Sequence, residues 1–179
     1  MAPSPTDFNA MAETCRSRVY RAACLLLDDP HEAEDVTQKV FVEAWRGWSR
    51  FEGRSEPFTW LFTILRRVCA RHCRRKWWTL FRFNGFVSWE EADKLISDSP
   101  VPDEIQTVKD RHFEVRKLLQ LLSPRLREVL VLRYIEEYSV RQIADALRIP
   151  EGTVKSRINY ALLIASNLWN KEMKYDKGE

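Results

Sequence analysis

The chain has 179 residues, of which 45% are hydrophobic and 31% are charged, and its formal net charge is +3. This length allows one larger domain or two small ones, and the long helical patterns with only five glycines favour an all-α fold. No apolar run approaches membrane-spanning length, and Met1–Met11 has neither a basic start nor an apolar core. We therefore expect no membrane insertion, no signal peptide, and a cytoplasmic protein whose four cysteines are reduced.

The first half of the sequence is typical of three helices joined by short turns. After a loose tail to about Phe8, the apolar spacing predicts helices over residues 10–27, 31–48 and 57–78. The clearest loop, over residues 51–57, precedes the third helix. The second helix is amphipathic, and its polar side carries Glu32, Glu34, Asp35, Gln38 and Glu43.

The third predicted helix carries a concentration of positive charge. Six cations and no acid lie between Arg66 and Lys76. Helical spacing places Arg67, Arg71, Arg74 and Arg75 on one face, with Trp60 and Ile64 at its border, while Leu61, Leu65, Val68, Cys69 and His72 share another. A cationic stripe beside an aromatic ring is the expected footprint for a phosphate backbone and unstacked bases. An ordinary solvated face is the alternative.

Three potential metal ligands lie close together on the same helix. Cys69, His72 and Cys73 could share a metal ion, because they are three and four residues apart. Structural zinc normally takes four ligands, and no second pair stands nearby in the sequence. Buried thiols on a helix face are therefore the preferred interpretation, and no metal or cofactor is predicted.

Residues 79–111 differ from the rest of the chain. Their aromatic residues are too closely spaced for one amphipathic helix, and six acids stand against Lys94 alone between Phe86 and Glu104. We interpret this stretch as an acidic linker with one short helix at most. Opposed blocks of charge at 66–76 and 86–104 suggest separate surfaces for separate partners.

Helical order returns at about His112 and continues to about residue 172. Ser123 and Pro124 begin a helix whose apolar positions are Leu126, Val129, Leu130 and Tyr134. Ser139 and Gln142 form a capping box at the start of a short helix with Ile143, Ala144 and Leu147 on its apolar face. The pattern breaks at Arg148–Pro150, and a last helix buries Val154 and Ile158.

The two helices around this break predict a helix-turn-helix. The second helix leaves hydroxyls, an amide and cations outward, at Thr153, Lys155, Ser156, Arg157 and Asn159. These groups suit the DNA major groove, which presents hydrogen-bond acceptors, donors and flanking phosphates. A plain helical hairpin is the alternative.

Two groups of motifs stand in a fixed order along the chain. The first group comprises Glu32–Trp45, Arg50–Gly53 and Phe58–Leu61, and the second Leu122–Val129, Leu132–Tyr134 and Gly152–Arg157. Together they resemble bacterial RNA polymerase sigma factors of the extracytoplasmic-function group. The resemblance covers roughly residues 19–76 and 118–168.

The resemblance implies two small helical domains joined by a linker. A domain over residues 10–78 would bind core polymerase and open the minus-ten promoter element. A helix-turn-helix domain over 112–172 would read the minus-thirty-five element, and the linker would thread the RNA exit path. The implied protein is a transcription initiation factor rather than an enzyme. Its partners are core RNA polymerase and promoter DNA, and an anti-sigma factor is left open.

The resemblance also implies roles for individual residues. The polymerase-facing positions are Glu34, Asp35, Gln38, Phe41 and Trp45. Those expected at the minus-ten element are Glu52, Gly53, Arg54, Ser55, Trp60, Arg66, Arg67, Arg71, Arg74 and Arg75. Those expected at the minus-thirty-five element are Arg141, Thr153, Lys155, Ser156, Arg157, Asn159 and Tyr160.

Three positions depart from the family pattern. Lys39 stands where relatives usually carry an acid, which alters the expected polymerase contact. Arg148 takes a turn position often held by glycine, where a positive φ is easiest. Asn159–Leu162 replaces the basic residues that usually follow Arg157.

Two other functions compete with this interpretation. A stand-alone helix-turn-helix regulator would explain the second half but leave the polar helix over 31–48 and the cationic stripe unexplained. An enzyme acting on DNA would need an acid cluster for metal ions or a glycine-rich phosphate loop, and the sequence shows neither clearly.

Overall fold

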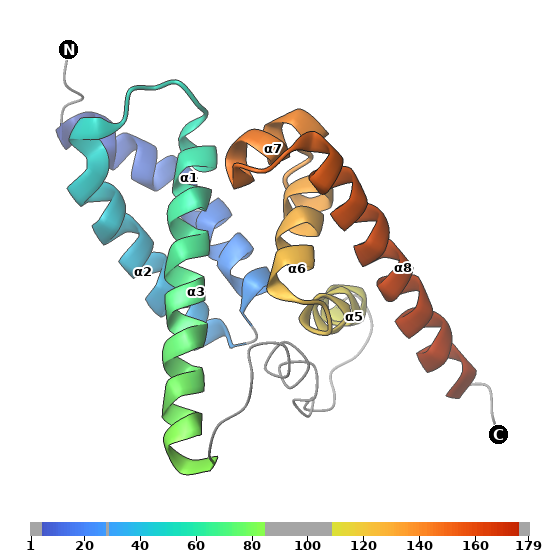
Figure 1. Ribbon diagram of the computed structural model, residues 1–179. Helices are drawn as coiled ribbons and strands as arrows, with labels where there is room; N and C mark the ends of the chain where they lie inside the picture. The colour runs from blue at the N-terminus through green and yellow to red at the C-terminus, as the bar shows by residue number, and fades with distance from the viewer. Residues whose placement is uncertain (1–4, 28, 85–108, 176–179) are drawn as a thin grey trace. The chain divides into compact units, whose positions relative to one another are not determined.

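The computed structural model of the chain describes residues 5–27, 29–84 and 109–175 (Figure 1). Within these ranges the regular secondary structure is helical and contains no strand, which confirms the all-α prediction. The chain divides into two compact units, Met1–Phe86 and Val87–Glu179. None of the helices in the described part of the chain is long and apolar enough to cross a membrane.

The first unit is a three-helix bundle. Helices α1 (Pro5–Leu26), α2 (Pro30–Gly47) and α3 (Pro57–Asn84) contact one another pairwise, and a 3₁₀ turn, η1 (Trp48–Arg50), follows α2. Apolar residues three and four apart on each helix meet in the bundle core, because that spacing returns them to one helix face. Its fully buried side chains include Val19, Val36, Val40, Phe58, Leu61, Phe62 and Leu65.

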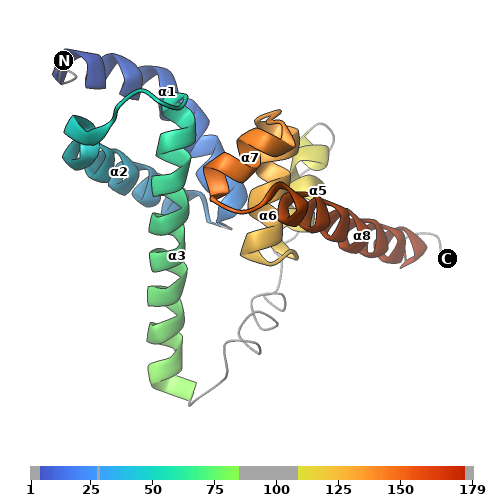
Figure 2. The same cartoon turned by 45° about the horizontal axis from the view of Figure 1, so that its top comes forward.

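Two helix bounds in this unit differ from the prediction. Helix α1 begins at Pro5, so the expected loose tail to Phe8 was wrong. Phe8 is buried because its ring packs edge-on against Trp45 and Trp48, with centroids 5.1 and 5.4 Å away. Helix α3 reaches Asn84 rather than residue 78, and Figure 2 shows its far end extending beyond α1 and α2. No proline or glycine interrupts the helix before residue 85, which explains its length.

The start of α2 is fixed by the residue that precedes it. The backbone N–H of His31 donates to the Asp29 carboxylate over 2.7 Å, and Pro30 fills the first helical position. The helix that follows keeps its apolar residues inside, so its polar residues face outward as a set. This arrangement positions the candidate site on α2.

The second unit packs its shorter helices on one long helix. Its elements are α5 (Lys109–Gln120), α6 (Pro124–Leu130), the π-helical turn η3 (Val131–Ile135), α7 (Val140–Leu147) and α8 (Glu151–Tyr175). Helix α8 contacts α5, α6 and α7, so the core lies along one side of α8. Side chains buried there include Leu122, Val129, Leu132, Ile143, Val154 and Ala161.

A buried arginine holds α5 to α6. Arg127 is 4% exposed, and its guanidinium donates to the carbonyl oxygens of Leu119, Gln120 and Leu122 over 2.7, 2.9 and 3.0 Å. Carbonyls at the C-terminal end of a helix have no partner within that helix. Arg127 therefore supplies hydrogen bonds at the end of α5 from a neighbouring helix.

The π-helical turn overturns one sequence expectation. Tyr134 was expected on the apolar side of its helix, four residues after Leu130, but it is 55% exposed. The backbone N–H of Glu136 donates to the Val131 carbonyl, five residues back, over 3.1 Å. This wider turn rotates the later side chains away from the four-residue spacing, so Tyr134 leaves the core side.

The helix-turn-helix forms as predicted between α7 and α8. The Gln142 N–H donates to Ser139 Oγ over 3.2 Å, and the Ser139 N–H donates to Gln142 Oε1 over 2.9 Å, which completes the capping box. Arg148 ends α7 in the left-handed conformation, at φ 55° and ψ 49°. Val154 and Ile158 are buried, as their spacing predicted.

Candidate functional site

The polar face of α2 is presented to solvent. Glu34, Asp35 and Gln38 are exposed, while Val36 and Val40 on the inner side of the same helix are fully buried. The other two residues predicted here differ in exposure: Phe41 is half-buried, and Trp45 is 49% exposed although Phe8 packs on one edge of its ring. The structure thus places acids, an amide and an exposed aromatic ring along one helix.

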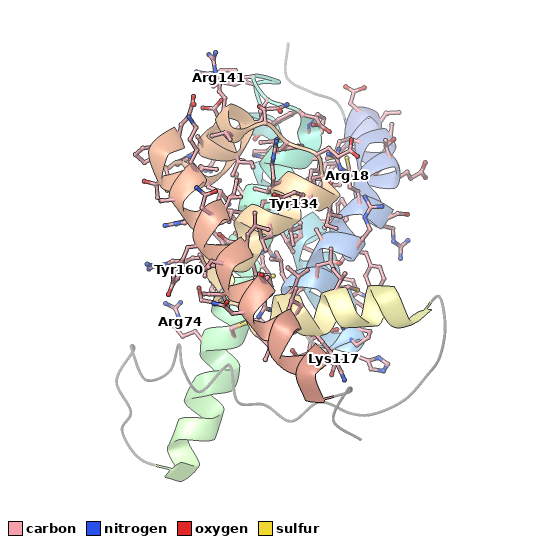
Figure 3. The ribbon with its side chains drawn as sticks, turned by 90° about the vertical axis from the view of Figure 1, so that its right-hand side faces the viewer. Arg18, Arg74, Lys117, Tyr134, Arg141 and Tyr160 are labelled. Carbon is pink, nitrogen blue, oxygen red and sulfur yellow. The ribbon has the colours of Figure 1, made fainter. Side chains whose placement is uncertain are left out.

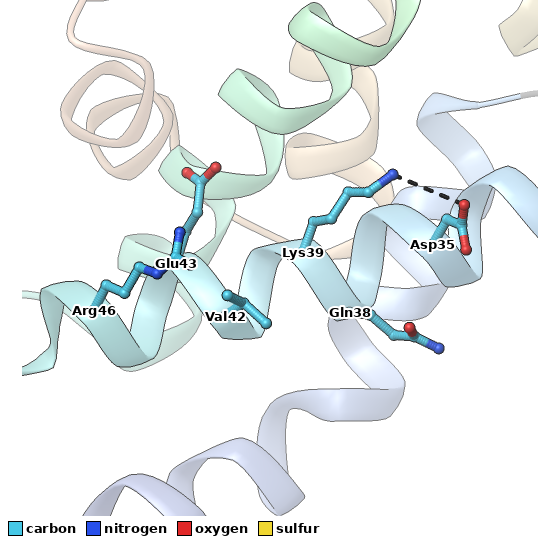
Figure 4. A pocket seen from close by; sticks show the side chains of 6 residues that line it. All are labelled: Asp35, Gln38, Lys39, Val42, Glu43 and Arg46. Atoms are coloured by element: carbon cyan, nitrogen blue, oxygen red, sulfur yellow. Dashed lines mark ion pairs between the residues drawn. The ribbon is translucent and has the colours of Figure 1, made fainter.

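A hollow of about 250 Å³ lies on this face, as Figure 4 shows. Its lining residues are Asp35, Gln38, Lys39, Val42, Glu43 and Arg46. Lys39 Nζ lies 3.8 Å from Asp35 Oδ2, and Val42 is 49% exposed at the surface. Val42 and Arg46 were not among the predicted site residues. Their spacing of seven and eleven residues from Asp35 is the helical signal that could have identified them.

A second, larger hollow is lined by residues of both α1 and α2. Its volume is about 720 Å³. Three predicted residues on α2, namely Glu34, Gln38 and Phe41, line it together with Thr37. From α1 it is lined by Asn9, Ala12, Glu13, Arg16, Ser17 and Tyr20.

The loop between η1 and α3 exposes all of its predicted residues. Glu52, Arg54 and Ser55 are exposed, and Glu52 and Arg54 form an ion pair. Gly53 adopts φ 67°, a left-handed conformation that favours glycine. The loop therefore presents its polar side chains outward from a tight turn.

Aromatic residues anchor both ends of this loop. Trp48 and Phe51 stack before it, with ring centroids 5.2 Å apart, and Trp60 after it lies 4.9 Å from Phe51. Trp60 is half-buried, so one part of its ring packs in this cluster and another part is accessible. The aromatic cluster brings the residues on the two sides of the loop close together.

A contact that was not predicted fastens the loop end to α1. Arg18 forms an ion pair with Glu56, and its guanidinium carbon lies 3.9 Å from the centroid of the Phe58 ring. Cys15 lies nearby in sequence, and burial raises the pKa of its thiol, while the Arg18 charge acts in the opposite direction. Arg18 is thus a support for the loop rather than a separate exposed cation.

The arginine stripe on α3 is partly engaged within the bundle. Arg67, Arg71 and Arg74 are exposed and Arg66 is half-buried, whereas the side chain of Arg75 lies outside the described part. Arg71 forms an ion pair with Glu43 of α2. Ile64, which was expected at the border of the stripe, is 3% exposed, because it faces the bundle core.

Two of the residues considered as metal ligands pack within the first unit. Cys69 is buried, and His72 Nε2 lies 3.2 Å from Glu32 Oε2 on α2. Within the described residues, no group of three or more histidines, cysteines or acids is placed to hold a metal ion.

The second helix of the helix-turn-helix presents most of its predicted residues. Lys155, Ser156, Asn159 and Tyr160 are exposed, whereas Thr153 and Arg157 are half-buried. Figure 3 shows Tyr160 pointing outward from α8 and Arg141 pointing outward from α7. The turn therefore supplies an exposed polar surface built from two helices.

Comparisons with known families match both units. Residues 11–79 match the family "Sigma-70 region 2", and residues 112–163 match "Sigma-70, region 4". Each match falls within one compact unit, and together the two matches include α2, the exposed loop and the helix-turn-helix.

Similar proteins extend across both units. The sigma factor SigL of Mycobacterium tuberculosis is 34% identical over 145 residues, which cover 80% of this chain and 78% of SigL. SigX of Bacillus subtilis is 29% identical over 149 residues, which cover 83% of this chain and 76% of SigX.

Solved structures show the same fold. The sigma factor RpoE in complex with the anti-sigma factor NepR from Bartonella quintana gives a TM-score of 0.71 at 24% identity, covering 92% of this chain and 97% of RpoE. CnrH in complex with the cytosolic domain of CnrY gives a TM-score of 0.65 at 23% identity, covering 94% of this chain and 90% of CnrH. The family matches and the identity to SigL establish that this chain belongs to the ECF RNA polymerase sigma factors, which bind core polymerase and direct promoter-specific transcription initiation.

Proposed function

We propose that three surfaces of this sigma factor have separate roles in initiation. The outer face of α2 binds the clamp of core polymerase. The loop over residues 52–56 and the arginines of α3 bind the minus-ten element. Helix α8, supported by Arg141 of α7, reads the minus-thirty-five element.

The exposed face of α2 is the observation that carries the first role. Glu34, Asp35 and Gln38 lie together on a helix whose other side is fully buried, so their carboxylates and amide are held facing outward. Charged groups arranged in this way give specificity and speed to association with a partner of opposite charge. Positively charged side chains on the clamp would therefore complement the carboxylates of Glu34 and Asp35.

The loop and α3 suit a melted DNA segment. A base that leaves the stack needs hydrogen-bonding groups and an aromatic surface, and unpairing it costs a few kcal/mol. Glu52, Arg54 and Ser55 supply exposed polar groups beside the half-buried ring of Trp60. Exposed Arg67 and Arg74 are positioned on α3 to attract the strand phosphates.

An anti-sigma partner and a cytoplasmic location complete the proposal. RpoE and CnrH, which share this fold, were solved with NepR and with the cytosolic domain of CnrY, respectively. Control by a protein of this kind fits a chain that exposes its polymerase-binding face on α2. Action on core polymerase places the chain in the cytoplasm.

The experiment that tests the proposal is a binding titration with core polymerase. Asp35→Arg reverses a charge at an exposed position of α2, so we expect core affinity to fall by about tenfold or more, since like charges at an interface cost several kcal/mol. The melting temperature should remain close to that of the unmodified chain.

Asp145→Arg is the matched control, because Asp145 is exposed on α7 and lies outside the proposed polymerase face. It makes the same change of charge and should leave core affinity unchanged. Normal core binding by the Asp35→Arg variant would overturn the assignment of α2.

A further inference from the structure

Lys39 places a positive charge in the middle of the acidic face of α2. It lies four residues after Asp35 and four residues before Glu43, so the three side chains follow one another on the same side of the helix. Glu43 is already paired with Arg71, whereas Lys39 and Arg46 flank the hollow in which Val42 is exposed (Figure 4). The face is therefore acidic near its start, and around the hollow the cations Lys39 and Arg46 lie among the acids Asp35 and Glu43.

The ion pair with Asp35 does not explain the presence of Lys39. The two charged atoms are 3.8 Å apart, and the side chains are 54% and 67% exposed. Exposed pairs at this helical spacing contribute little, because water screens them and both side chains lose freedom when they pair. Breaking the ion pair costs little free energy, so Lys39 and Asp35 can each bind another partner instead.

We propose that the polymerase surface that docks on α2 places a carboxylate group against Lys39, beside the cations that receive Glu34 and Asp35. This inference rests on the proposed role of α2 in core binding. The acidic side chain occupies the hollow between Lys39 and Arg46, and an apolar neighbour covers Val42. Docking separates Lys39 from Asp35 and gives each of them a partner of opposite charge on the polymerase.

The surroundings favour a protein carboxylate over a DNA phosphate. Asp35 and Glu43 line the same hollow, and Glu34 is exposed one residue from Asp35. A phosphate backbone carries a negative charge at every nucleotide and would meet these acids along its length, whereas a single protein carboxylate needs only the space between Lys39 and Arg46. An exposed valine also suits a protein surface, because interface cores combine apolar contacts with a polar rim.

Charge reversal at Lys39 tests the inference by titration of the full chain with core polymerase from its own organism. Lys39→Glu should lower the affinity by about tenfold or more, because it sets two carboxylates against each other. Lys39→Arg keeps the charge and should bind normally. Arg125→Glu, an exposed reversal on α6 outside the proposed surfaces, is the matched control.

A zero-length carbodiimide cross-linker gives a second, direct readout, because it joins an amine only to a carboxylate in contact with it. In the free chain we expect the link from Lys39 to Asp35. In the sigma–core complex we expect Lys39 to link to an aspartate or glutamate of the polymerase. The Lys39→Arg variant should lose this link and still bind, since arginine does not react.

The outcomes separate the inference from the proposed function. Normal binding by both Asp35→Arg and Lys39→Glu would overturn the assignment of α2 as a whole. Weak binding by Asp35→Arg with normal binding by Lys39→Glu would overturn the inference alone. The inference would also be overturned if Lys39 still cross-linked to Asp35 in the complex. The same holds if Lys39→Glu changed only the salt dependence of promoter binding.

Discussion

Arg157 and Lys155 stand two residues apart on α8 and differ in exposure. Arg157 is half-buried, whereas Lys155 is exposed. A planar guanidinium can form two parallel hydrogen bonds with a guanine edge, and an ammonium acts as a point charge. We therefore expect the two cations to have different roles in the proposed reading of the upstream element.

We expect Arg157→Ala to change the preferred upstream promoter sequence at one position. Losing a bidentate base contact costs roughly 1–3 kcal/mol against the correct base. Lys155→Ala should weaken binding to all promoters alike and reduce the salt dependence, as the loss of a phosphate contact does. Selection from a randomised promoter library with each variant distinguishes the two effects. If neither variant changes preference or affinity, α8 does not read the upstream element.

Single residues show where sequence reasoning succeeds and where it stops. The positive φ of Arg148 was predictable, because a tight turn between two helices needs a left-handed residue at that position. The exposure of Tyr134 was not predictable, since it depends on a π-helical turn that has no distinctive local sequence. The contacts of Arg127 with the end of α5 depend on how two helices pack, which helical spacing does not specify.

At the scale of helices, α2 and α3 are joined by polar side-chain contacts as well as by their core. Glu43 of α2 pairs with Arg71 of α3, and Glu32 lies 3.2 Å from His72. The first pair holds an arginine of the predicted DNA stripe against the bundle. If Arg71 binds DNA as proposed, we expect Glu43 to compete with the phosphates for it.

Glu43→Gln should release Arg71 for DNA. We expect tighter binding of the holoenzyme to a forked minus-ten fragment at low salt. The slope of log affinity against log salt should become steeper by about 0.7–0.9, the value for one additional phosphate contact. Glu32→Gln, which removes a charge at another paired position of α2, is the control and should leave the slope unchanged. An unchanged slope for Glu43→Gln would mean that Arg71 does not reach DNA.

The helices themselves were largely predictable, because caps and apolar spacing are local features. Pro30, Pro57 and Pro124 mark helix starts in the sequence and in the structure. The early start of α1 depends on Phe8 finding Trp45 and Trp48, which are distant in sequence. The pairing of Arg71 with Glu43 likewise depends on how α2 and α3 pack against each other. The sequence therefore predicted an arginine stripe whose members are all alike, whereas Arg71 is paired within the bundle.

For the whole molecule, the two units each contain a separate buried core. Leu65 is fully buried among α1, α2 and α3, and Ile143 is fully buried in the second unit. Folding free energy is gained where apolar surface leaves water, so each unit has its own source of stability. We infer that the two units unfold as separate cooperative units.

Two core substitutions test this inference in the full chain. Leu65→Ala and Ile143→Ala should each destabilise one unit by roughly 2–5 kcal/mol, as expected for large aliphatic residues cut back in a packed core. Calorimetry should show two transitions, of which each variant shifts one. A common shift of a single transition would show that the chain unfolds as one unit.

The aromatic cluster around Trp48, Phe51 and Trp60 has a consequence for how this protein can diverge. The cluster fixes the residues on both sides of the loop over 52–56, and within the loop Glu56 pairs with Arg18 of α1 while Glu52, Arg54 and Ser55 are exposed. Lengthening a closed loop is inexpensive, at about 0.6 kcal/mol for each doubling of its length. We therefore expect insertions and substitutions to be tolerated at Glu52, Arg54 and Ser55 while the bundle stays folded, so that the proposed minus-ten contact can change faster than the fold that carries it.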